Sequence, residues 1–312
     1  MAREENVEAP ATGVDGTGVD EELATLLGAR RDGFPGADTS RGLLLTALGE
    51  YALPAGGEVW TQTLVDALGL VGVRDKAARQ AIARLHDRGW LERRRVGRRT
   101  RWRLTRPAVE LLESGAERIY GFGTSPPPWD GRWLVLLASV PERDRSIRYR
   151  MGVELGWAGF GSLGQGVWLS PWLDREGEVV DALRRLGVEA TTFRSELGAL
   201  GSGPALVDQA WNLTELQRKY DDFVATATRA TTATAPTAPA ATGGEAAVAE
   251  LTTLVHRWRR FPFLDPDLPA DLLPADWPRP LAARAFSERR AALLGPARRW
   301  WESAEADLTP LR

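Results

Sequence analysis

Residues 89–105 read GWLERRRVGRRTRWRLT, and seven of these seventeen residues are arginine. The halves WLERRR and TRWRLT flank VGRR, and two such runs around a glycine-containing turn predict a β-hairpin. Crowded guanidinium groups repel one another and help folding little, whereas each arginine that meets a nucleic-acid phosphate releases counterions. Trp90, Leu91, Trp102 and Leu104 are expected to anchor one face of the hairpin. The candidate phosphate contacts are Arg93, Arg95, Arg98, Arg99, Arg101 and Arg103.

Three helical patterns come before the hairpin. Apolar spacing begins in RGLLLTALGEYAL at 41–53, and helical periodicity returns in 61–70 and 74–87 after short glycine-containing breaks. Three helices with short connections, followed by a hairpin, are the order of a winged helix-turn-helix. With a further helix expected at 107–121, residues 39–125 are predicted to form a DNA-binding domain of this type.

The helix predicted at 74–87 has two different faces. Small and apolar residues such as Ala81 and Leu85 recur at helical spacing and form its packing stripe. The opposite face carries side chains suited to base edges, because arginine forks onto guanine and glutamine onto adenine. A solvated helix surface has the same composition, and the neighbouring arginine-rich hairpin is what favours DNA here. The candidate base-reading residues are Lys76, Arg79, Gln80 and Arg84.

The placement of charge supports this interpretation. Residues 74–106 include thirteen basic and three acidic side chains, a net of +10, in a chain whose formal net charge is −2, so the remainder carries −12. A mostly acidic protein with one intensely basic segment is typical of a protein that holds a polyanion in one place. Genomic composition is the alternative explanation for the preference for arginine, since the only lysines are Lys76 and Lys219.

The pattern changes after the proline-rich break TSPPPWDG at 124–131. Strand and helix patterns then follow in the order β-α-β-β-α-β, which is the ferredoxin-like unit. We expect residues 130–203 to form such a domain and to act as a platform for dimerisation. Its elements are expected at 132–139 (strand), 143–158 (helix), 159–171 (two strands), 176–187 (helix) and 188–195 (strand).

Small CRISPR-associated nucleases share the ferredoxin-like unit, so a metal-dependent nuclease is the alternative from another functional class. Such enzymes require a carboxylate at the end of the first strand to hold a metal ion. Here that strand ends in Ala138, Ser139 and Val140, and the nearby Glu142 and Asp144 are typical of acids at a helix N-terminus. The sequence therefore predicts neither a metal site nor catalytic residues in this domain.

The remaining segments complete an α+β, multidomain fold class. Residues 206–312 are predicted to form an α-helical domain, in which the low-complexity segment 225–246 is a loop. Residues 1–38 are rich in glycine, alanine and acids, and they are expected to be a disordered leader. The helices of the C-terminal domain are expected at 211–224, 247–260 and 281–302.

Composition and motif spacing argue against several function classes. The chain has no cysteine, which excludes disulfides, thiolate nucleophiles and cysteine-based metal sites. The histidines, His86 and His256, have no histidine or cysteine neighbour, and GFGSLGQG at 159–166 lacks the lysine of a phosphate loop. No apolar run reaches the ~18 residues of a membrane span, and the N-terminus has no apolar signal region. We expect a cytoplasmic protein that uses no cofactor.

Several blocks of the sequence resemble one known family. LLLTALGEY, ARQAIARLHDRGWLERRRVGRRTRWRLT, WDGRWLVLLASVPE and LGWAGFGSLGQGVWLSP, in this order, look like the PaaX-type repressors of phenylacetic acid catabolism. FPFLDPDLPADLLPADWP is similar to that family's Asp-Pro and Leu-Pro signature, and the resemblance covers roughly residues 40–224 and 247–303. It implies a homodimeric transcriptional repressor, and a two-fold dimer would bind an inverted-repeat operator in double-stranded DNA. An activator of the same architecture is the alternative.

The resemblance also implies release of the operator when an aryl- or acyl-CoA thioester, such as phenylacetyl-CoA, binds as effector. Arginine forks phosphate and an indole stacks on a base, so the candidate effector-binding residues are Arg257, Trp258, Arg259 and Arg260. An amphipathic helix with an exposed basic face is the alternative interpretation of these four residues.

Two positions depart from the family pattern. The N-cap of the helix at 74–87, often serine in the family, is Arg74, so the cap either moves to Asp75 or is lost. The glycine that usually follows the Trp-Pro pair is replaced by Arg279, which is expected to alter the local turn.

Overall fold

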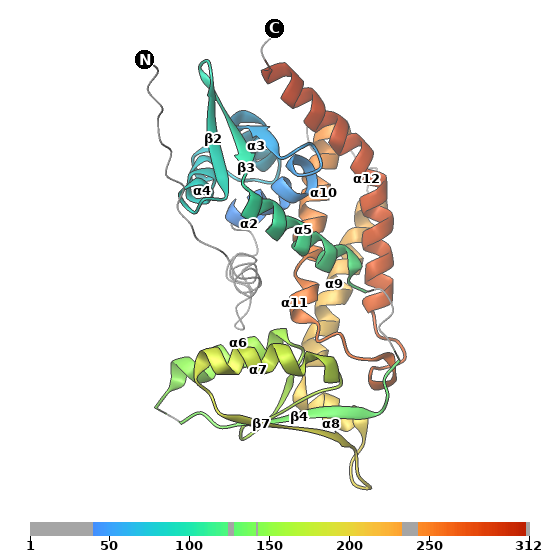
Figure 1. The fold of residues 1–312 in the computed structure, drawn as a ribbon. Coiled ribbons are helices and arrows are strands. Elements are labelled where there is room, and N and C mark those ends of the chain that lie inside the picture. The colour runs from blue at the N-terminus through green and yellow to red at the C-terminus, as the bar shows by residue number, and fades with distance from the viewer. Residues whose placement is uncertain (1–39, 124–127, 142, 233–242, 310–312) are drawn as a thin grey trace, which may run out of the picture.

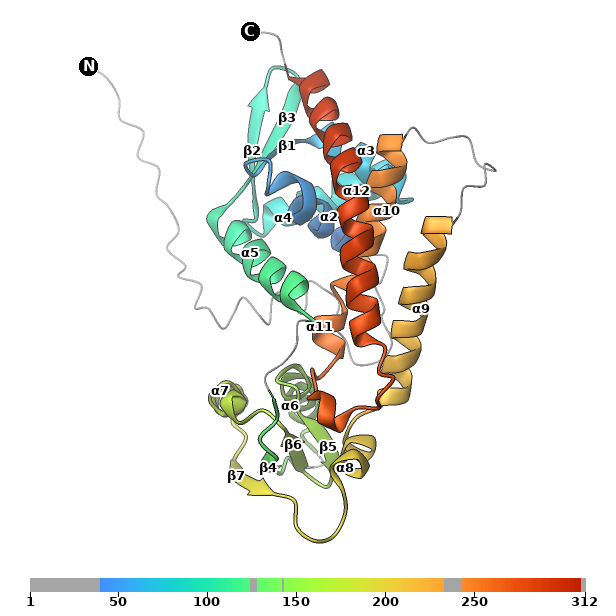
Figure 2. The same cartoon turned by 90° about the vertical axis from the view of Figure 1, so that its right-hand side faces the viewer.

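The structure, a computed structural model, describes residues 40–123, 128–141, 143–232 and 243–309. It is an α+β protein with two antiparallel sheets among these residues, one at each end of the molecule (Figure 1). The long helices of the C-terminal part run alongside the N-terminal elements, and the second sheet lies beyond their far end (Figure 2). The leader predicted at 1–38 lies outside the described residues.

The N-terminal elements follow the predicted order of helices and hairpin. Strand β3 is central and pairs antiparallel with β1 on one side and β2 on the other. Two features were not predicted, namely the short strand β1 and a π-helical turn that ends the first helix. The elements are α2 (Ser40–Ala47), the π-helix η1 (Leu48–Ala52), β1 (Glu58–Trp60), α3 (Thr61–Leu70), α4 (Asp75–Asp87), β2 (Leu91–Val96), β3 (Arg99–Leu104) and α5 (Arg106–Gly121).

The β2–β3 hairpin is anchored by the apolar residues that the sequence predicts. Trp90, Leu91, Trp102 and Leu104 are all buried. The indole Nε1 of Trp102 donates a hydrogen bond to Thr61 Oγ1 of α3 over 2.9 Å. The hairpin therefore has a fixed position against the helices that precede it.

The second sheet has the topology expected for the ferredoxin-like unit. Its strand order, β5-β6-β4-β7, is antiparallel throughout, and its elements alternate as β-α-β-β-α-β. The elements are β4 (Arg132–Ala138), α6 (Arg145–Trp157), β5 (Gly161–Gly164), β6 (Val167–Ser170), α7 (Glu176–Leu186) and β7 (Ala190–Glu196).

The two faces of this sheet have different surroundings. Leu134 and Leu136 share a buried cluster with residues of α6 and α7, which cover one face. On the other face, α8 (Gly203–Ala210) lies against β5, where Gly161 is required because an added Cβ would be 2.5 Å from the Trp211 indole. Toward β7 this second face is open, and Leu137 and Phe193 are 43% and 52% exposed.

The C-terminal part is helical, but its helices extend beyond the predicted bounds. α9 (Leu213–Thr232) and α10 (Gly243–Trp258) both enter the segment 225–246, which was predicted as a loop; that prediction is wrong at both ends. Alanine favours helix, and Ala227 is buried, so packing extends α9 into the low-complexity segment. Residues 233–242 lie outside the described residues. The other elements are α11 (Phe261–Leu264), a 3₁₀ turn η3 (Ala270–Leu272) and α12 (Arg279–Leu308).

Arg279, the departure from the family's glycine, is a buried structural residue. Its guanidinium Nη1 lies 2.6 Å from Asp267 Oδ1 and 3.5 Å from Asp265 Oδ1. Its Nη2 donates to the Leu268 carbonyl over 3.2 Å. The arginine therefore fixes the turn at 265–268 against the start of α12.

Candidate nucleic-acid interface

Helix α4 places the four candidate base-reading residues on its exposed face. Ala78, Ala81, Ile82 and Leu85 are buried, so the predicted packing stripe is confirmed for these residues. Small alanines at the contact let α4 approach its neighbours closely. The side chains left on the exposed face include Lys76, Arg79, Gln80 and Arg84.

Arg79 is held by its neighbours, whereas Arg84 is not. The Arg79 Nε and Nη2 atoms donate to the two carboxylate oxygens of Asp75 over 2.7 and 3.1 Å, and Nη2 also lies 3.3 Å from Gln62 Oε1 of α3. The hydrogen bond from Arg79 lowers the pKa of Asp75 below its usual range. Among the described residues, Arg84 forms no ion pair or side-chain hydrogen bond. Arg84, like Lys76 on the same face, is therefore a basic side chain that can reach a base without first leaving a partner among the described residues.

The cap expected near Arg74 is lost. Arg74 has extended backbone at the N-cap position, and its side chain makes no capping hydrogen bond. Asp75 is the first helical residue, and its carboxylate binds Arg79 instead. An acid in the first turn still stabilises a helix through the helix dipole.

Strand pairing divides the hairpin arginines between two faces. Directly paired residues of antiparallel strands share a face, and Arg93 pairs with Trp102 whereas Arg94 pairs with Arg101. Arg94, Arg99, Arg101 and Arg103 consequently lie on the face opposite the buried Trp102. We call this set of four the arginine face. The sequence interpretation omitted Arg94, although strict alternation along the strand is enough to place it there.

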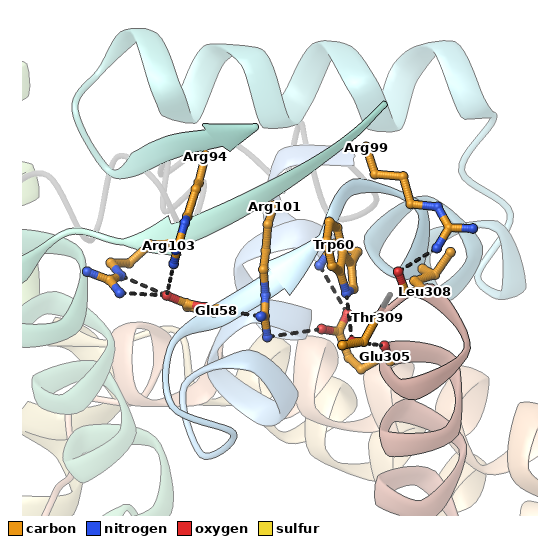
Figure 3. Close-up of polar contacts among 9 residues, drawn as sticks. All are labelled: Glu58, Trp60, Arg94, Arg99, Arg101, Arg103, Glu305, Leu308 and Thr309. Carbon is orange, nitrogen blue, oxygen red and sulfur yellow. Dashed lines mark hydrogen bonds and ion pairs between the residues drawn. The ribbon is translucent and has the colours of Figure 1, made fainter. Parts of the chain in front are cut away.

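The arginine face is occupied at one end by Glu58 of the unpredicted strand β1 (Figure 3). Arg103 donates from Nε and Nη2 to Glu58 Oε1 over 2.9 and 2.7 Å. Arg101 Nη1 lies 3.3 Å from Glu58 Oε2. The hydrogen bonds from Arg103 keep the pKa of Glu58 below its usual range, so the carboxylate stays charged and neutralises part of this face.

The other end of the arginine face contacts the C-terminal end of α12 (Figure 3). The Arg101 guanidinium lies 5.3 Å from the centre of the Trp60 ring, and Glu305 accepts a hydrogen bond from the Trp60 backbone N–H over 3.0 Å. Arg99 donates to the Leu308 carbonyl, and a cation is favoured there because the C-terminus of a helix is electronegative.

The structure thus separates the six predicted phosphate contacts into two groups. Arg99, Arg101 and Arg103 have partners within the protein. The other three predicted contacts are Arg93, Arg95 and Arg98. All three residues are exposed, and their side chains form no ion pair or side-chain hydrogen bond with any described residue. Arg94, with 67% of its side chain exposed and only a 4.0 Å contact to Glu58, lies between Arg93 and Arg95 in the sequence but on the opposite face of the hairpin.

The four predicted effector-binding residues do not form one surface. The side chain of Arg257 pairs with Asp222 over 2.5 Å, whereas Trp258 is buried and donates to the Ile119 carbonyl over 3.0 Å. Arg259 is buried at 4% exposure, and Arg260 is half-buried. Arg257 and Trp258 end α10, where consecutive side chains point about 100° apart, and Arg259 and Arg260 lie in the turn after it.

The residues considered for metal chemistry are also dispersed. His86 Nδ1 is 2.7 Å from the Leu91 carbonyl, and His256 Nδ1 is 3.3 Å from Thr46 Oγ1. Asp144 precedes α6, and Glu142 lies outside the described residues. Within the described ranges, no three histidine, aspartate or glutamate side chains gather as they would around a metal ion. Over the same ranges, no helix has the length and apolarity to cross a bilayer.

Comparison with known protein families covers nearly all of the described chain. Residues 39–108 match the model of PaaX-like protein, residues 126–207 that of the PaaX protein central Cas2-like domain, and residues 211–303 that of the PaaX-like protein C-terminal domain. The chain belongs to the PaaX family. The match to the central Cas2-like domain of PaaX agrees with the ferredoxin-like topology of the second sheet.

Two individual proteins extend the comparison. The chain is 30% identical over 261 residues to the transcriptional repressor PaaX of Escherichia coli (strain K12), and the match covers 82% of this chain and 80% of that protein. It is similar in structure to the uncharacterized protein Rv0674 from Mycobacterium tuberculosis, with a TM-score of 0.56 and 24% sequence identity. That match covers 85% of this chain and 99% of the other, and it shows a shared fold.

Proposed function

We propose that the chain is a sequence-specific, DNA-binding transcriptional repressor that works in the cytoplasm, with residues 39–125 as its winged helix-turn-helix domain. The observation that carries this proposal is the exposed Arg84 face of α4 beside three exposed hairpin arginines without protein partners. Membership of the PaaX family and the name of the E. coli relative support it. In this arrangement α4 reads base edges in the major groove, and the hairpin binds the backbone.

Arg84→Ala tests the role of α4. We expect the affinity for the operator to fall by ~1–3 kcal/mol, about 5- to 150-fold, with the loss confined to operators that carry the preferred base at one position. The measurement is a mobility-shift titration against a set of single-base operator variants, with Arg88→Ala, an exposed arginine just beyond the end of α4, as control. A loss that is equal for all operator variants would contradict base reading by Arg84.

We further propose that the domain at 130–203 joins two copies into a homodimer that recognises an inverted repeat. The open face of the second sheet supports this, because Phe193 pairs with Val135 and, like Leu137, leaves a large apolar side chain exposed. A two-fold dimer uses the same patch on both copies. Contiguous exposed apolar area of this kind is typical of a protein interface.

Phe193→Asp should therefore convert the dimer to monomer, because the substitution places two carboxylates in one apolar interface. Light scattering after size-exclusion chromatography gives the mass directly. Leu281→Asp, which alters a residue of α12 that is 48% exposed, is the matched control and should leave the dimer intact. A wild-type chain that is already monomeric at micromolar concentration would contradict the homodimer.

The proposed effector is phenylacetyl-CoA or a related acyl-CoA thioester, and the proposal rests on the family. A mobility-shift assay on the protein's own promoter, with and without the thioester, tests binding and release together. Transcription from that promoter in vitro then separates the repressor from an activator of the same architecture, because only a repressor lowers the transcript when it binds.

A further inference from the structure

A small cavity lies where the N-terminal elements meet α10. Its volume is roughly 50 Å³, and α2, the π-helix η1, α5 and α10 all contribute to its wall. Most of the lining is apolar, with Leu45, Leu111, Leu112, Ile119 and Val255 among the residues that face it. The polar side chains in the wall include Glu50 and Arg259.

Arg259 is a buried cation without a counter-ion. It is 4% exposed, and its Nε atom is enclosed and has no hydrogen-bond partner. Within the described part of the chain, its side chain forms neither an ion pair nor a hydrogen bond. Arg279, which is also deeply buried, has two aspartates. A buried charge without a partner is costly, so Arg259 is a residue that an anion from solution would satisfy.

The charge of Arg259 persists at neutral pH. Burial, and secondarily the neighbouring Arg260, lower the pKa of Arg259 to about 9. A guanidinium with this pKa is still protonated at pH 7. Its planar fork matches a carboxylate with two parallel hydrogen bonds.

Glu50 restricts the charge of the anion. Tyr120 and Arg290 both donate to Glu50 Oε1, the latter from Nη2 over 2.7 Å, whereas Glu50 Oε2 is enclosed and has no hydrogen-bond partner. Burial and the Glu50 carboxylate raise the pKa of Tyr120, which keeps its hydroxyl protonated as a donor. A carboxylate already present in the wall repels a second negative charge, so a monoanion is favoured over a phosphate dianion.

The lining and the size of the cavity define the rest of the ligand. Apolar walls favour an acid with a hydrocarbon body. A water molecule needs about 10–15 Å³ of cavity volume, so a cavity of roughly 50 Å³ holds about three to five non-hydrogen atoms, the size of an acid of two or three carbons. The π-helix η1 contributes Gly49 and Glu50 to the wall, and irregular turns of this type occur frequently at functional sites.

We propose that this cavity binds a small aliphatic monocarboxylate whose carboxylate pairs with Arg259. The site joins α2 and α5, which belong to the N-terminal elements, to α10 of the C-terminal part. Binding of the acid consequently stabilises the packing of α2 and α5 against α10 and changes the affinity for DNA. Only this last effect rests on the proposed function, because the site itself needs no DNA.

Thermal unfolding of the full-length chain tests the site. Sodium propionate should raise the midpoint of unfolding by ~2–4 °C in a saturable way, whereas sodium chloride and sodium phosphate at equal ionic strength should not. Isothermal titration with propionate should give one site per chain. Equal stabilisation by chloride or phosphate would overturn the proposal, and so would the absence of any saturable heat with acids of two or three carbons.

Three variants locate the site. Arg259→Met should abolish the response to propionate and leave the ligand-free midpoint at or above that of the wild type, because an uncompensated buried charge is replaced by an apolar side chain of similar length. Ala116→Leu, which fills the cavity from α5 and leaves Arg259 in place, should also abolish the response. Arg257→Met, which alters an arginine two residues earlier that is paired with Asp222, should keep it. A response retained by both cavity variants would overturn the assignment to Arg259.

A mobility-shift titration with and without propionate separates the site from the proposed function. A change in operator affinity in the wild type, absent in Ala116→Leu, is the expected result. Saturable binding of propionate with unchanged operator affinity would overturn the coupling and leave the site established. Failure to bind any promoter DNA would overturn the proposed function, while the thermal and calorimetric results would still decide the site.

Discussion

Replacing Arg93, Arg95 and Arg98 together by alanine is expected to weaken DNA binding about a hundredfold for every operator variant alike. These three side chains are exposed, and none has an ion-pair partner among the residues that the structure describes. Each phosphate contact releases about 0.9 counterions, so three lost contacts should make the plot of log K against log salt less steep by about 3. The measurement is fluorescence anisotropy with labelled operator between ~50 and ~200 mM salt.

The control removes the same charge from another part of the molecule. Arg143, Arg184 and Arg218 are exposed arginines on the second sheet's domain and on α9, and their replacement by alanine also changes the net charge by −3. If binding depended only on overall charge, the two triple variants would be equally weak, and the hairpin would have no special role. Retention of binding by the control alone supports direct contact between the hairpin and the backbone.

The hairpin and helix α4 could be predicted because the patterns that define them lie within short stretches of sequence. The alternating arginines and tryptophans around Gly97 define the hairpin, and small residues at helical spacing define the buried side of α4. The strand β1 was missed because the three residues EVW are too short to show a period. The π-helix η1 was missed because apolar spacing does not separate it from an α-helix.

The site was less predictable because its charges are balanced by distant residues. Arg99 and Arg101 find partners at the end of α12, which lies about two hundred positions later in the sequence, and no local pattern reports such a contact. Of the four candidate effector residues, Arg257 and Trp258 end α10, and helical geometry shows that these two neighbours cannot face one ligand. That argument excludes a single surface but does not select Arg259, whose isolation depends on the packing of α2 and α5 against α10.

Arg279→Ala is expected to lower the free energy of unfolding by ~3–5 kcal/mol, because it leaves a buried aspartate without its cation. The side chains of Arg279 and Asp265 are 6% and 2% exposed. Tyr220 donates its hydroxyl to Asp265 Oδ2 over 2.6 Å, and the Asp267 backbone N–H donates to Oδ1 over 2.7 Å. These hydrogen bonds remain in the variant, but the charge of Arg279 does not.

The pKa of Asp265 indicates why the loss should be large. Burial raises the pKa of this carboxyl, and the charge of Arg279 is the main influence that opposes the rise. Without the arginine, Asp265 either stays charged in an apolar site or takes up a proton on folding, and both cost free energy at pH 7.

Urea unfolding followed by tryptophan fluorescence gives the change in midpoint, with Arg284→Ala, an exposed arginine on the same helix, as control. Arg279→Ala combined with Asp265→Asn should recover part of the loss, since the amide needs no counter-ion. If the double variant were no more stable than Arg279→Ala, the contribution of Arg279 would come from its contacts with Asp267 and the Leu268 carbonyl and not from neutralising Asp265.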